Sequence, residues 1–150
     1  MADPIVERIL KAAKARLEAI VAVPGLVIGR NRRGSVEEDR ALILQDGDQV
    51  HGEEQTMFVQ NFRTIGVEGF AKTDSEEEIG PAINVLWAEA VITLTADENI
   101  TLGGLAIEIT LGEYTSNMVL EDDQRWSGEF RQEFTIHYAT KRGDPYSLAP

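Results

Sequence analysis

The chain of 150 residues contains no cysteine, which excludes a disulfide scaffold, thiol catalysis and cysteine-ligated zinc or iron–sulfur sites. Long apolar runs are missing too: none approaches the 18 residues that a membrane-spanning helix needs, so we expect no membrane contact. Basic residues are scarce, with 14 Lys and Arg against 26 Asp and Glu, for a net charge of −12. Because affinity for phosphate backbones comes mainly from Lys and Arg, this balance disfavours tight binding of nucleic acid.

Motifs for catalysis and cofactor binding are also absent. The sequence has neither glycine-rich phosphate-binding pattern nor a GxSxG nucleophile elbow. Of the two histidines, we interpret His51 as a solvated loop residue near Glu53 and Glu54, and His137 as a surface or interface residue. Asp46-Gly47-Asp48 matches the start of a calcium loop, but the later ligands are missing. We therefore predict no cofactor, no metal site and no enzyme activity, and keep a small carboxylate enzyme as the less favoured alternative.

Apolar residues make up 43% of the chain, enough to bury a core at this length. We expect one domain over residues 1–150, ordered over about 4–140, with a loose tail over 141–150. The first residues lack the basic start and apolar run of a signal peptide, which favours synthesis in the bacterial cytoplasm.

Two segments show helical periodicity. Residues 4–20 place apolar side chains on one face, with Asp3 as the N-cap and Pro4 at the first helical position. Residues 75–94 do the same, with Ser75 and Glu78 in the spacing of a capping box.

Strand patterns are expected at 26–28, 41–44, 57–71, 105–111 and 129–140, with a polar mobile loop over 45–55. The order α-β-β-β-α-β-β predicts an α+β fold: a largely antiparallel or mixed sheet of about five strands, with two helices on one face.

The one concentration of basic residues is Arg30, Arg32 and Arg33. A solvated loop is the ordinary interpretation. The sharper hypothesis is a subunit contact, in which this loop meets the acidic block Glu76, Glu77 and Glu78 of another copy. Such a head-to-tail contact closes into a ring.

The C-terminal third carries a family resemblance. It contains a Leu102-Gly103-Gly104 turn leading into a strand, an acidic loop, the aromatic-rich strand 128–138 and an exit at Gly143-Asp144-Pro145. Together with the order of elements, this resembles the tail terminator proteins of long-tailed bacteriophages and gene transfer agents, the lambda-type minor tail protein family. The matching motifs cover about residues 102–146.

The resemblance implies a structural virion protein at the head-proximal end of the tail. Such proteins form a hexameric ring that stops polymerisation of the major tail tube protein and presents a surface to the head-completion or connector protein. DNA passes through the lumen without specific binding. Residues 111–120, with Tyr114 and Met118, would then extend as a mobile hairpin that contacts the tube or the connector. A tail-tube, connector or completion protein is the alternative.

Overall fold

The computed structural model describes residues 2–32 and 36–150, with eight helices and strands among them. In chain order these are α1 (Ile5–Glu18), β1 (Val27–Arg30), β2 (Arg40–Glu54), β3 (Phe58–Thr73), α2 (Glu76–Thr95), β4 (Glu108–Leu120), β5 (Trp126–Lys141) and β6 (Asp144–Leu148). The strands form one mixed sheet in the order β1-β2-β3-β5-β4, with β6 paired to β5. The α+β prediction is confirmed, with six strands in place of about five.

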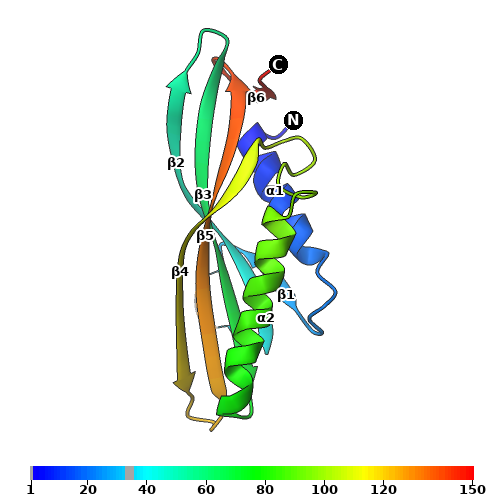
Figure 1. Cartoon of the computed structure of the whole chain (residues 1–150), viewed down its shortest axis with the longest axis vertical. Helices are drawn as coiled ribbons and strands as arrows, with labels where there is room; N and C mark the ends of the chain where they lie inside the picture. Colours follow the sequence, from blue (N-terminus) through cyan, green and yellow to red (C-terminus); the bar gives the residue numbers. More distant parts are fainter. Residues whose placement is uncertain (1, 33–35) are drawn as a thin grey trace.

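Both helices lie on the same side of the long twisted sheet (Figure 1). Their apolar faces pack against inward-facing residues of β2, β3 and β5, as the helical and strand periodicities require. The largest fully buried side chains of this core include Ile9, Leu17, Leu42, Leu44, Ile65, Ile79, Ile83, Leu86 and Phe134. None of the described helices is long and apolar enough to cross a membrane.

The central strands fit closely at one glycine. Gly69 lies directly opposite Phe130 in the β3–β5 ladder. A Cβ added at Gly69 would fall 1.9 Å from Cε1 of Phe130. The ring of Phe130 therefore occupies the space that any side chain at Gly69 would need.

The expected polar loop over 45–55 is instead the outer half of β2. It pairs with β3 through residues such as Gln49 and Val50, with register shifts between Asp46 and Gln49 and between His51 and Glu54. This hairpin projects past the helices (Figure 1). Neither face has a helix there, so the sequence shows no inside–outside alternation to reveal the strand.

Residues 111–120 are likewise part of a strand, β4, paired with β5 from Glu108 to Leu120. Residues 144–148, within the segment expected to be loose, form β6, and Leu148 lies opposite Thr140. Gly143, with a φ of 75°, allows the sharp reversal that returns the chain to β5.

The predicted helix caps are wrong in detail. Pro4 is the N-cap of α1, and Asp3 accepts a hydrogen bond from Lys11 at 2.7 Å instead. Ser75 is the N-cap of α2, but its side chain makes no capping hydrogen bond.

Candidate assembly surfaces

Arg30 forms its ion pairs with residues of the same copy. Its guanidinium donates to Glu7 of α1 at 2.6 and 2.9 Å and to Asp46 of β2 at 3.0 and 2.8 Å. These hydrogen bonds lower the pKa values of Glu7 and Asp46 and raise the pKa of Arg30. Arg30 therefore links α1 to the sheet. These contacts within one copy account for the position of Arg30 without a contact to a second copy.

The other residues of the predicted contact between copies differ in their surroundings. Arg32 donates to Glu38 at 2.8 Å, and Arg33 lies outside the described residues. Glu76, Glu77 and Glu78 are exposed in the first turn of α2, where the helix dipole favours carboxylates. Of the described arginines, Arg30 and Arg32 make no ion pair with these glutamates within one copy, and a contact between copies stays a prediction.

Tyr114 and Met118 lie on β4, an edge strand of the sheet. Their register partners are Gln132 and Gly128 of β5, which places both on the side of the sheet that carries the helices. Tyr114 packs edge-on against Trp87 at 5.8 Å between ring centroids, whereas Met118 is 47% exposed. Twelve of the 13 residues of β4 are exposed, Ile109 being the buried one.

Gln132 fixes the irregular part of this edge. Its amide oxygen accepts from Nε1 of Trp87 at 2.9 Å, and its amide nitrogen donates to the carbonyl oxygens of Gly112 and Glu113 at 3.1 and 3.3 Å. Those carbonyls belong to the register shift between Leu111 and Tyr114. One buried side chain thus connects α2 to the bulge in β4. In the sequence, the only signal of this role is that Gln132 is a polar residue on an otherwise apolar strand face.

Charge is strongly segregated along the chain. The segment 73–124, which includes α2 and β4, contains twelve Asp and Glu and no Lys or Arg. Its charge therefore equals the net charge of the whole chain, and in the remaining residues the acidic and basic side chains balance. By contrast, α1 contains four basic residues against two acidic ones.

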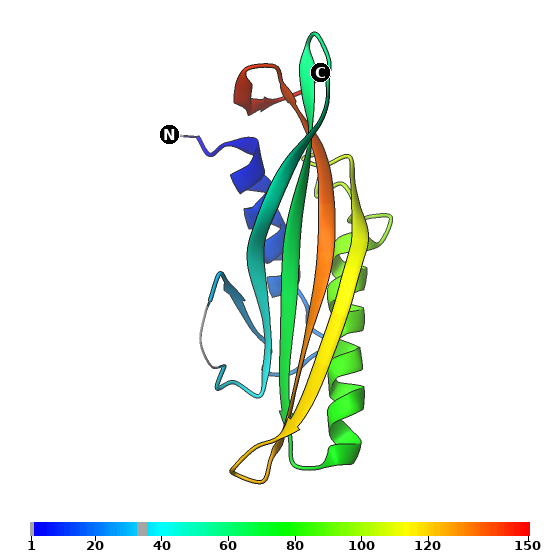
Figure 2. The same cartoon turned by 90° about the vertical axis from the view of Figure 1, so that its left-hand side faces the viewer.

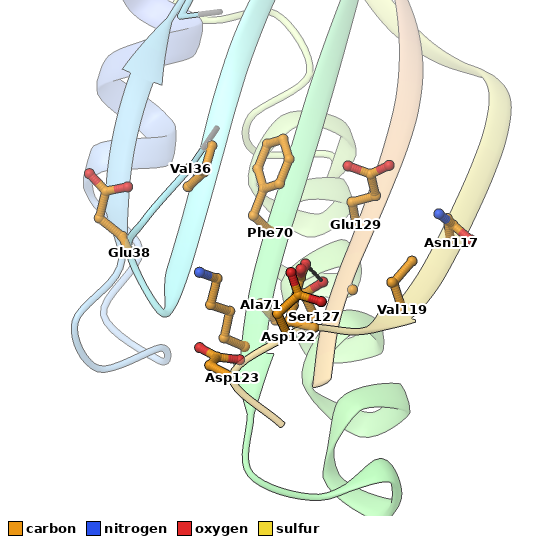
Figure 3. A pocket seen from close by; sticks show the side chains of 13 residues that line it. Val36, Glu38, Phe70, Ala71, Asn117, Val119, Asp122, Asp123, Ser127 and Glu129 are labelled. Atoms are coloured by element: carbon orange, nitrogen blue, oxygen red, sulfur yellow. Dashed lines mark hydrogen bonds between the residues drawn. The ribbon is translucent and has the colours of Figure 1, made fainter. Parts of the chain in front are cut away.

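The sheet face that carries no helices has a shallow hollow of about 550 Å³ (Figure 3). Phe70 and Lys72 lie among carboxylates from three parts of the chain: Glu38, Glu121, Asp122, Asp123 and Glu129. Among these, the pKa of Glu38 is lowered by Arg32. Nearby, the guanidinium of Arg131 lies over Gly66 and donates to Glu68 at 3.0 Å. This arrangement supplies charged surface rather than an enclosed reaction site.

Both histidines lie in the sheet. His51 is in β2, where its Nδ1 is 2.8 Å from the side-chain oxygen of Asn61, so its prediction as a loop residue is wrong. His137 stacks on Phe62 at 4.4 Å between ring centroids, and its Nε2 is 2.9 Å from Gln60. Among the described residues, no group of three or more His, Asp or Glu is arranged to hold a metal ion.

Comparison with known proteins identifies a similar fold but no sequence family. No family model and no curated protein matches the chain. Among solved structures, a chain from the virion of a native gene transfer agent particle is similar, with a TM-score of 0.60 and 8% sequence identity. The match covers 89% of this chain and 97% of that chain. The likeness therefore extends over almost the entire fold of both proteins.

Proposed function

We propose that this protein is a structural virion subunit, and specifically a tail terminator that caps the head-proximal end of a phage-like tail as a hexameric ring. In that position it stops polymerisation of the major tail tube protein and offers a joining surface to the head-completion protein.

The observation that carries the proposal is the fold comparison. The similar chain belongs to the virion of a gene transfer agent particle, and the two similar folds align over nearly their full lengths. The terminator-like sequence features lie in the same fold: the Leu102 turn precedes β4, and the aromatic-rich strand is β5, which lies between β3 and β4 in the sheet.

The surface of the subunit suits a conduit assembled from several copies. An edge strand with exposed apolar residues is typical of a surface that pairs in an assembly. The acidic excess would repel the DNA backbone and so let DNA slide through the lumen without being held.

A tail-tube or connector protein is the alternative, because a subunit with two open sheet edges can also add copies without limit. The difference is closure. A terminator stops at one ring, whereas a tube subunit continues to polymerise.

Native mass spectrometry across a concentration series, with negative-stain images of the same samples, tests the proposal. A closed ring of six copies is the expected result, and open-ended tubes would instead support the tail-tube alternative. If the protein stays monomeric, it should still cap the ends of tails built from the cognate tube protein. Failure to bind either end of such tails would overturn the proposed function.

A further inference from the structure

β4 forms one edge of the sheet and runs beside α2 (Figure 2). Its inner side pairs with β5, and the ladder is regular from Tyr114 to Leu120. On its outer side, no strand within residues 2–32 and 36–150 pairs with it. The strand also lacks Pro, Lys and Arg, the residues that commonly protect an edge from pairing. The outer backbone groups of 114–120 are therefore available to a further strand.

The helix side of this segment is apolar. Tyr114, Met118 and Leu120 lie on that side and are 42–48% exposed. The ring of Tyr114 meets Trp87 of α2 edge-on. After its first turn, α2 contains one charged residue, Glu89. A strand added beside 114–120 would therefore meet mainly apolar surface on its helix side.

The opposite side of the same segment is acidic. Asn117 and Val119 face the side without helices and border the shallow hollow (Figure 3). The exposed carboxylates of the hollow that make no salt bridge among the described residues are Glu121, Asp122, Asp123 and Glu129. Lys72 is the one basic residue among the described residues that line the hollow. The negative charge beside this part of β4 is thus left largely uncompensated within the subunit.

A second copy of the chain has no edge that complements this charge. β1 covers only residues 41–44 of β2, the other edge strand in this part of the sheet. Residues 46–54 of β2 contain four Asp and Glu and no Lys or Arg. β4 itself lies in the segment 73–124, which contains no basic residue either. Pairing β4 with either edge of a second copy would bring like charges together, which is unfavourable.

We propose that residues 114–120 of β4 receive an extended strand from a different protein, in which apolar residues alternate with Lys or Arg. Because successive side chains of a strand point to opposite faces, the apolar residues would lie beside Tyr114 and α2, and the basic ones beside the carboxylates of the hollow. Backbone hydrogen bonds supply affinity in such contacts, and the alternating side chains supply specificity. The contact rests on the proposed function in one respect, that the partner is another virion protein.

Hydrogen exchange in the presence of designed peptides tests the contact on the whole protein. The probe is a short peptide in which lysine alternates with valine or threonine. One control peptide has glutamate in place of every lysine, and another has proline at its centre. At low salt the lysine peptide should slow exchange by roughly tenfold or more at alternate amides of 114–120, because an added strand bonds to every second residue. Neither control peptide should do so.

Three results would overturn the contact. The lysine peptide could fail to bind, it could bind without slowing exchange at β4, or the slowing could be confined to the outer half of β2. Equal slowing by the proline peptide would count against strand pairing as well, because proline cannot donate a backbone hydrogen bond.

Charge reversal separates this surface from the acidity of the protein in general. D122K/E129K changes two exposed carboxylates of the hollow, and the matched control E18K/D48K changes two exposed carboxylates elsewhere by the same charge. The first variant should bind the lysine peptide roughly tenfold more weakly than the control and should gain affinity for the glutamate peptide. Equal affinities in the two variants would contradict the contact, and circular dichroism shows whether each is folded.

The contact and the proposed function fail separately. If the protein caps tails but the lysine peptide does not pair with β4, the contact is wrong and the terminator role stands. If the peptide pairs with β4 but the protein binds neither end of a tail, the contact stands and the terminator role is wrong.

Discussion

β3 and β4 both pair with β5 along most of their length, yet they have opposite environments. β3 is covered by α2 on one side and flanked by β2, so residues such as Ile65 and Val67 are fully buried. β4 has the same central neighbour, but nearly all its residues are exposed. Hydrogen bonding in a ladder therefore does not make a strand part of the core. Burial depends on what lies above the strand and beyond it.

The sharpest test of this contrast uses two residues that face each other. Phe134 of β5 is fully buried, and Leu111, its partner on β4, is 51% exposed. F134A should lower the free energy of unfolding by about 3–5 kcal/mol, because it removes a large core side chain. L111A should cost less than about 1 kcal/mol. Urea unfolding followed by circular dichroism measures both, and equal losses would contradict the description of β4 as an uncovered edge.

A smaller effect is expected where the two environments meet, at Gln132. Q132A leaves the indole N–H of Trp87 and the bulge carbonyls without their partner, at a cost of about 1–3 kcal/mol. Hydrogen exchange should also become faster at the β4 amides around Gly112 and Glu113. The control W87F removes only the indole donor and should leave the bulge protected. Unchanged exchange in Q132A would show that the bulge is held by other contacts.

The ion pairs of Arg30, which link α1 to the sheet, should make the stability difference between wild type and R30M depend on pH. Arg30 lowers the folded-state pKa values of Glu7 and Asp46 from ordinary values of 4.5 and 3.8. The stabilisation is therefore present above those values and is lost as the pH falls through the lower folded-state pKa values. The stability advantage of wild type over R30M should be full at pH 7 and should shrink below about pH 4.5. An advantage that stays constant down to pH 2 would contradict the ion-pair origin.

The smallest effect on stability is expected at Met118. M118T should change the free energy of unfolding by less than about 0.5 kcal/mol, because the side chain is exposed and threonine suits a strand. Thermal unfolding monitored by circular dichroism checks this. A large loss would show that Met118 belongs to the core of one subunit.

The sequence predicts best what the core determines. The two helices and the apolar faces of β3 and β5 follow from periodicity, because one side of each is buried. Periodicity does not reveal the outer half of β2 or most of β4, since most of their residues are at least partly exposed and their composition is typical of a loop. The partners of Arg30 could not be read from spacing either, because Glu7 lies 23 residues away and is brought close only by the fold.

The uneven placement of charge has a consequence for how copies meet. All the net negative charge lies in α2, β4 and their loops, whereas α1 has four basic residues against two acidic ones, so charge is unevenly distributed across the width of the sheet. Two subunits approaching in dilute buffer would rotate each other so that their strongly acidic β4 edges turn apart before the subunits touch. Because each copy also carries a net charge of −12, added salt would screen the repulsion between copies together with this orienting effect.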